Sequence, residues 1–238
     1  MRQKEKVDKT IVIPGDLLSD DAAKAGEGTY IENGKVYSLI YGLADDRERI
    51  RIIPLSGKYL PTIGDIVIGM VSDISFSNWK ININSPYEAL MHISEYPRRI
   101  ESSEMAKIMR VGDLAIFKVV DVDQSMKIEL APREGQLRVL SSGRVVEVSY
   151  TKVPRVIGRA GSMVSLLKDK LDVNIFVGKN GRIWINGKAA DEELAVKAIK
   201  RIEQEAHTSG LTDRITKFLE EEKHGVYEKR QEDRRSSS

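Results

Sequence analysis

A Gly-x-x-Gly pair, Gly158-Arg159-Ala160-Gly161, constrains the fold of this chain more than any other feature. Glycine has no Cβ, so such a turn lets the backbone approach a partner closely. A helix-compatible apolar run follows from Val164 to Leu171, and the first amides of a helix are unpaired and lie at the positive end of its dipole. A phosphodiester backbone fits that geometry, and Arg159 adds positive charge. The alternative is a tight turn between two packed helices.

The segments around this turn indicate a definite order of elements. Residues 144–148 read as a strand, and residues 173–185 read as a hairpin with Asn180-Gly181 in its turn. Apolar residues repeat on one helical face between residues 191 and 206. The order of strand, short helix, Gly-x-x-Gly, helix, strand, strand and helix resembles the KH domain of type I order. That module binds single-stranded nucleic acid.

Positive charge is concentrated in the same segment. Residues 143–190 contain nine Lys and Arg but three Asp and Glu, a net charge of +6, whereas the whole chain carries +2. A basic surface suits phosphate binding, although an ordinary solvated face is the alternative. The resemblance implies that this loop and its neighbours clamp about four nucleotides of backbone. The candidate RNA-binding residues of the module are Arg155, Gly158, Arg159, Ala160, Gly161, Ser162 and Lys168.

Residues 64–131 predict a second module. Five short apolar segments, with an irregular stretch between the third and the fourth, fit a five-stranded OB barrel. The segment resembles the S1-type RNA-binding domain. The residues that carry this resemblance are Gly64-Asp65, Phe76 with Trp79 three residues later, His92-Ile93-Ser94-Glu95 and Gly112-Asp113.

The S1 resemblance implies that Phe76, Trp79 and His92 lie on a nucleic-acid face, where bases stack on flat rings. Arg98 and Arg99 follow in the irregular stretch and are further RNA-binding candidates. For Trp79 the alternative is the barrel core, because it shares strand parity with the apolar Ile81 and Ile83. Residues 64–131 hold seven cations and ten anions, so this module alone should bind RNA weakly or act partly as a docking body.

The predicted fold class is α+β with several domains. Short strands at regular spacing predict a small N-terminal β domain at residues 1–60, in which residues 1–9 are frayed. An S1-type barrel at 61–134 and a KH domain at 135–206 follow. Residues 207–238 should form a terminal helix with a narrow apolar stripe, then a charged, disordered tail from His224.

Composition excludes several classes of function. The 238 residues contain no cysteine, so disulfides and thiolate metal sites are excluded and a cytoplasmic location is expected. The apolar runs are too short for a membrane span, and the N-terminus is not a signal peptide. His92, His207 and His224 fall in separate segments, so no metal site is expected, and no cofactor motif is present.

The order of the three modules resembles the S1/KH cap subunit of the archaeal RNA exosome and its eukaryotic relatives. The resemblance covers about residues 10–206 and implies a non-catalytic role. Three copies would sit on a hexameric ring of phosphorolytic subunits, with the N-terminal domain making most of the ring contact. They would capture single-stranded RNA and feed its 3′ end to the ring for 3′-to-5′ degradation and processing.

Two other functions remain open on the sequence. The first is a free-standing RNA-binding regulator or translation-linked factor. An apolar surface on strands near residues 30–41 would distinguish an assembly platform from such a lone binder. The second is a metal-dependent nuclease, suggested by the pair Asp121 and Asp123. Carboxylates at turns are usually just solvated, so no catalytic residue is expected.

Overall fold

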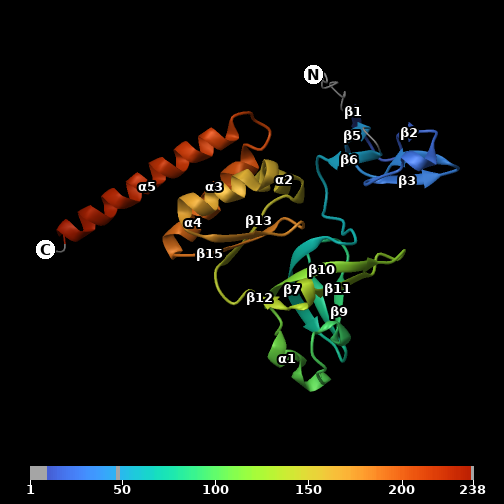
Figure 1. Cartoon of the computed structure of the whole chain (residues 1–238), viewed down its shortest axis with the longest axis horizontal. Helices are drawn as coiled ribbons and strands as arrows, with labels where there is room; N and C mark the ends of the chain where they lie inside the picture. Colours follow the sequence, from blue (N-terminus) through green and yellow to red (C-terminus); the bar gives the residue numbers. More distant parts are fainter. Residues whose placement is uncertain (1–9, 47–48, 237–238) are drawn as a thin grey trace. The chain divides into compact units, whose positions relative to one another are not determined.

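A computed structural model of the chain describes residues 10–46 and 49–236, with side chains as far as residue 223. The chain divides into two compact units, with the boundary between Gly57 and Lys58 (Figure 1). The predicted fraying of residues 1–9 lies outside the described residues.

The first unit is a small β domain, as the sequence predicts. Its strands form two antiparallel three-stranded sheets, of order β1-β5-β6 and β2-β4-β3. Asn33 and Gly34 join β3 to β4 with φ values of 49° and 77°, the backbone that a type I′ hairpin turn requires. The strands are β1 (Thr10–Val12), β2 (Leu17–Ser19), β3 (Thr29–Glu32), β4 (Lys35–Ser38), β5 (Gly42–Asp46) and β6 (Ile50–Pro54).

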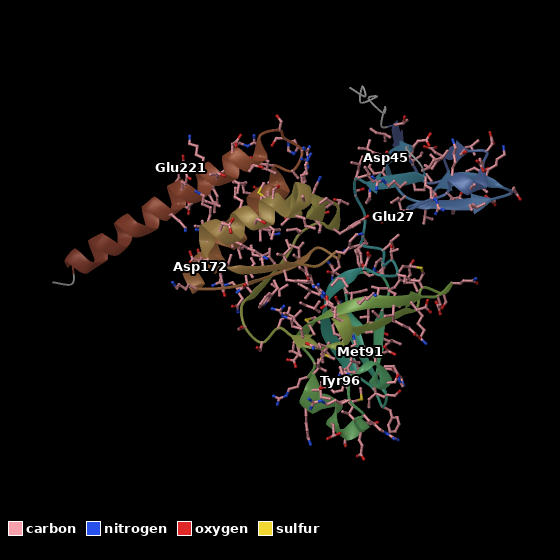
Figure 2. All side chains as sticks on the ribbon, in the orientation of Figure 1. Glu27, Asp45, Met91, Tyr96, Asp172 and Glu221 are labelled. Atoms are coloured by element: carbon pink, nitrogen blue, oxygen red, sulfur yellow. The ribbon has the colours of Figure 1, made fainter. Side chains whose placement is uncertain are left out.

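The second unit begins with the predicted five-stranded barrel. Both β9 and β10 pair with β11, so the sheet of order β11-β9-β8-β7-β10 closes on itself. Trp79, Phe117 and Met91 fill its interior, and Met91 is labelled in Figure 2. The elements are β7 (Ile66–Ile74), β8 (Asn78–Asn82), β9 (Ala89–His92), α1 (Met105–Ile108), β10 (Leu114–Val122) and β11 (Ile128–Pro132); β12 (Arg138–Val139) adds to β10 outside the barrel.

The KH module follows with the element order that the sequence predicts. Three strands form an antiparallel sheet of order β13-β15-β14, and helices cover one face of it (Figure 1). Leu167, Ile183 and Ile199 are among the fully buried side chains between the helices and the sheet. The elements are β13 (Arg144–Glu147), α2 (Val153–Ile157), α3 (Ser162–Leu171), β14 (Asn174–Val177), β15 (Arg182–Asn186) and α4 (Ala189–Gln204).

The other face of the KH sheet packs on the barrel. Successive side chains of a strand point to opposite faces, and β7 is apolar on both. Val67 points into the barrel core, whereas Ile68 joins Ile116 and Trp184 in a separate apolar cluster. Because Trp184 belongs to β15, this cluster joins the barrel to the KH sheet.

A buried arginine supports the same junction. Arg182, at the start of β15, is 6% exposed. Its Nη1 donates to the carbonyl oxygen of Asn82 at 2.6 Å, and its Nε donates to Glu147 Oε1 at 2.8 Å. Arg182 is one of the nine cations of residues 143–190, but these contacts commit it to the junction. It therefore adds no exposed charge for a nucleic-acid partner.

A long C-terminal helix, α5 (Leu211–Ser236), covers the KH helices at its start. Leu211, Ile215 and Leu219 are buried there, as the predicted apolar stripe requires. The helix continues through the segment from His224 that the sequence predicts to be disordered. Glu, Lys, Arg and Gln dominate that segment and are strong helix formers, so the structure extends the helix where the sequence predicts a tail. No helix in the described part of the chain is both long and apolar enough to cross a membrane.

Candidate nucleic-acid interface

The Gly-x-x-Gly loop joins α2 to α3; Arg159 and Ala160 are exposed, and the two glycines are half-buried. Gly158 has φ 76° and ψ 174°, a backbone that is essentially restricted to glycine. A Cβ at this position would lie 2.6 Å from the Met163 nitrogen. Gly161 has φ 82° but faces open space, with no atom within 4 Å of a built Cβ. The two glycines therefore have different roles, since Gly158 closes the turn and Gly161 leaves its surface open.

The start of α3 presents the positive end of its helix dipole to a partner at this loop. Gly161 occupies the N-cap position, and no side chain caps the helix there. Ala160 also has a positive φ, of 50°, so Ala160 and Gly161 are two successive residues with left-handed backbone. The Gly161 amide donates to the Gly158 carbonyl at 3.3 Å and the Ser162 amide donates to the Arg159 carbonyl, so the attraction for an anion comes from the positive end of the α3 dipole. The geometry fits a phosphate group beside Gly161 and Ser162.

The three predicted cations lie at different distances from the loop. Arg155 on α2 and Arg159 in the loop are exposed, and neither forms an ion pair within the described residues. Lys168 is exposed too, but it lies six residues along α3 from Ser162, about 9 Å at the helical rise. Arg155 and Arg159 therefore belong to the loop site, whereas Lys168 could contact only a more distant part of a bound strand.

Phe76 and His92 come together at one end of the barrel. Phe76 is 85% exposed in the loop between β7 and β8. His92 ends β9, where it pairs with Asn78, and the Ile93 amide donates to the Ser77 carbonyl at 2.8 Å. His92 Nδ1 accepts the Ser94 amide at 3.2 Å, so Nε2 is the ring atom left for a partner. The two residues can act together on one nucleotide chain.

The prediction that Trp79 stacks on RNA is wrong. Trp79 is fully buried in the barrel core, and its Nε1 donates to the Met109 carbonyl at 3.4 Å. It lies opposite Met91 on β9 and shares its parity with Ile81. The strand alternation that favours the core thus decides its position, and neither ring face is open to a base.

A pocket of about 370 Å³ adjoins His92. Its floor is apolar and its rim carries both donors and acceptors, which suits a flat polar group such as a base. Asn78, Lys127 and Glu129 were not predicted, because only the closure of the barrel brings these residues of β8, the turn before β11 and β11 beside His92. The lining residues are Asn78, Leu90, His92, Ser94, Glu95, Lys127, Glu129 and Leu130.

The predicted residues Arg98 and Arg99 line an adjoining pocket of about 380 Å³. Ser94 borders both pockets, and Tyr96 lies in the same loop (Figure 2). Both arginines are exposed and form no ion pair in the part of the chain that the structure describes. The loop after β9 thus places two free guanidinium groups beside the His92 pocket, where they can meet phosphates of a strand whose base occupies it.

Asp123, one of the candidate nuclease carboxylates, has a structural role. Its Oδ1 accepts the Ser125 hydroxyl at 2.7 Å and the Lys127 amide at 2.8 Å, and so closes the turn between β10 and β11. These hydrogen bonds, first that of Ser125, lower the pKa of the Asp123 carboxyl. Within the described residues, no group of three or more His, Asp and Glu is placed to hold a metal ion.

Family models match three successive parts of the chain. Residues 9–56 match the exosome RNA binding protein RRP4 N-terminal domain, residues 58–120 the RRP4 S1 domain, and residues 143–191 the KH domain. Fold and candidate surfaces together define a multidomain S1/KH protein of the RNA-binding class.

Curated relatives extend over most of the chain. The exosome complex component Rrp4 of Methanosarcina mazei is 55% identical over 218 residues, which cover 91% of this chain and 84% of the relative. The exosome complex component Rrp4 of Thermofilum pendens is 44% identical over a match that covers 90% of this chain and 94% of the relative. The chain belongs to the Rrp4 family of exosome components. A crystal structure described as an exosome complex RNA-binding protein is 41% identical, with a TM-score of 0.66 over 71% of this chain and 98% of that one.

Proposed function

We propose that this chain is a non-catalytic RNA-binding cap subunit of an exosome. The observation that carries the proposal is the open loop at Gly161, where the N-terminal end of α3, which no side chain caps, and the exposed Arg159 meet solvent in one place. The exposed Phe76 and His92 of the same unit add a stacking surface. Both surfaces suit a single-stranded nucleic acid, and the family relatives are named as exosome components.

The two surfaces would grip RNA without reading much of its sequence. Backbone amides and guanidinium groups contact phosphates, which are the same at every nucleotide. A base stacks on a ring such as Phe76 with about 1–3 kcal/mol, whatever its identity. Such contacts let a strand slide, so the chain can capture single-stranded RNA and pass its 3′ end to catalytic subunits for 3′-to-5′ degradation and processing.

The N-terminal unit supplies the docking surface in this proposal. Large apolar side chains are exposed there at Ile11, Ile31, Leu39 and Tyr41, with exposed fractions of 40% to 60%. Exposed apolar side chains in this number favour a protein partner. We assign that partner as a phosphorolytic ring of six subunits, with three copies of this chain on one ring.

A free-standing RNA-binding regulator is the alternative function. Affinity purification of the tagged chain from its native cells, followed by native mass measurement, separates the two. The cap role predicts recovery of ring subunits in a ratio of three copies to one hexamer, whereas elution of the chain alone overturns it.

The absence of catalysis needs a separate measurement. The purified chain should leave a labelled RNA intact in the presence of Mg²⁺ and phosphate, because Asp123 is committed to a turn. Shortening of that RNA by the pure chain would make it an enzyme.

A further inference from the structure

Two arginines lie over paired aromatic rings at the junction of barrel and KH sheet. Phe176 on β14 and Trp184 on β15 are directly opposite each other in the sheet register. The Arg133 guanidinium carbon lies 5.6 Å from the centre of the Phe176 ring, and that of Arg138 lies 5.3 Å from the Trp184 ring. Arg133 follows β11 and Arg138 begins β12, so both guanidinium groups come from the barrel side.

The rings under these arginines are fixed in place. Trp184 is 8% exposed, and its Nε1 donates to the Ser142 carbonyl at 2.7 Å. Phe176 packs against the same apolar cluster. A guanidinium that stacks on a fixed ring loses little further freedom when it binds a partner, because its plane is already oriented.

The positive charge at this junction is poorly neutralised. Both arginines are exposed. Arg133 pairs with Glu134 at 3.0 Å, but the Glu134 side chain is 77% exposed, and an ion pair in water contributes little. Arg138 forms no ion pair within the described residues. Two guanidinium groups over neighbouring rings therefore present an electropositive patch. This patch adjoins the barrel, whose residues 64–131 carry more anions than cations.

The Arg133 end of the patch lies over β14, the strand that follows α3. The helix α3 leaves the loop and spans about 15 Å over its 10 residues. After a turn of two residues, β14 runs back over about 13 Å. Phe176 is the third of its four residues, so Arg133 lies toward the C-terminal end of β14, on the face of the KH sheet that packs on the barrel.

We propose that Arg133 and Arg138 form a third binding site for single-stranded RNA, which takes phosphodiester groups between the KH loop and the His92 face of the barrel. A guanidinium fork matches a phosphate bidentately, and its outer face can stack on a base. The proposal rests on the RNA-binding function proposed above. If the arginines served only to join barrel and KH sheet by cation–π contacts, RNA binding would not depend on them.

Binding of a fluorescein-labelled single-stranded RNA to the full chain, at several salt concentrations, tests this site. The double variant Arg133→Gln/Arg138→Gln should bind about tenfold more weakly at low salt. Its slope of log affinity against log salt should fall by about 1.4, since each phosphate contact on a single strand contributes about 0.7. The matched control is Lys24→Gln/Lys217→Gln, which removes the same charge at two exposed positions elsewhere and should leave that slope unchanged.

The outcomes separate this site from the proposed function. If the wild type binds and Gly161→Asp weakens it, but the arginine variant keeps the wild-type affinity and slope, the junction site alone is overturned. If the wild type binds no RNA, the proposed function fails as well. Should the double variant unfold, arginine modification of the wild type by a phenylglyoxal reagent replaces it. Bound RNA should then protect Arg133 and Arg138 from modification, and a lack of protection overturns the site.

Discussion

Asn180 and Ile68 exchange two hydrogen bonds across the junction of the KH hairpin and the barrel. The Asn180 Nδ2 donates to the Ile68 carbonyl at 2.8 Å, and the Ile68 amide donates to Asn180 Oδ1 at 3.3 Å. The same Nδ2 also donates to the Ile83 carbonyl at 2.8 Å. Asn180 is fully buried, and its side-chain amide satisfies hydrogen-bonding groups of the barrel backbone that are buried with it.

The substitution Asn180→Ala should destabilise the second unit. It leaves the buried Ile68 amide without its Asn180 acceptor and the Ile83 carbonyl without its side-chain donor, whereas the Ile68 carbonyl keeps the Arg182 Nη1 at 3.4 Å. Each buried polar group without a partner costs about 1–3 kcal/mol. We expect a melting temperature lower by several degrees, measured by calorimetry. Asn174→Ala, at an exposed position of β14, is the control and should change it little. Equal melting temperatures for the two variants would contradict this account.

Much of the fold is predictable because its signals are local. The Asn-Gly turn of the KH hairpin and the helical period after residue 191 depend on neighbours in sequence. The junction is not predictable in this way. Asn180 reads as an ordinary turn residue and Arg182 as a surface cation, and only the approach of the barrel buries both.

The same difference between local signals and tertiary contacts applies to the candidate site. The Gly-x-x-Gly motif indicates where the backbone is open, because the reason lies in the glycines themselves. Trp79 could not be placed from its motif, since an aromatic residue suits both a stacking surface and a core. Asn78, Lys127 and Glu129 carry no signal of their own, because closure of the barrel brings them to the His92 pocket.

Phe76 and Trp79 should differ in what their loss affects. Phe76→Ala removes an 85% exposed ring, so RNA affinity should fall by about 1–3 kcal/mol with the melting temperature unchanged. Trp79→Ala empties part of the barrel core and should cost about 3–5 kcal/mol of folding free energy. Fluorescence anisotropy with labelled RNA and calorimetry measure the two effects. Normal RNA binding by Phe76→Ala would remove this ring from the interface.

The start of α5 should be held to the KH helices in a pH-dependent way. Glu205 accepts hydrogen bonds from Arg201 at 2.7 Å and from Arg214 at 2.6 Å. These bonds, first that of Arg201, lower the pKa of the Glu205 carboxyl below its usual 4.5. A lowered folded-state pKa means that the stabilisation is present above the unfolded-state pKa and is lost as the pH falls through the folded one.

The variant Glu205→Gln tests this dependence. It should melt at a lower temperature than the wild type near neutral pH, and the two should converge as the pH falls below 4.5. Lys217→Gln/Glu221→Gln removes an exposed ion pair on the same helix and serves as the control. If the difference in melting temperature between wild type and Glu205→Gln persisted unchanged at acidic pH, the stabilising role assigned to the Glu205 carboxylate would be contradicted.

Gly161→Asp is the most direct test of the loop, because the two glycines differ in how much room each leaves for a side chain. At Gly158 any side chain would collide with the Met163 backbone, so Gly158→Asp would perturb the fold and could not report on RNA alone. At Gly161 the space is open, and Asp and Asn both tolerate a left-handed backbone. Gly161→Asp should therefore fold, yet place a carboxylate where a phosphate binds. We expect RNA affinity to fall about tenfold, or ~1.4 kcal/mol.

The matched control is Gly161→Asn, which has the same shape and backbone preference without the charge. It should keep most of the affinity, so the ratio between the two variants isolates electrostatic repulsion from steric change. That ratio should also shrink as salt rises, because salt screens repulsion between exposed charges. Equal binding by Asp and Asn at low salt would mean that no phosphate lies at this loop, and RNA binding would then have to come from the barrel face and the junction arginines.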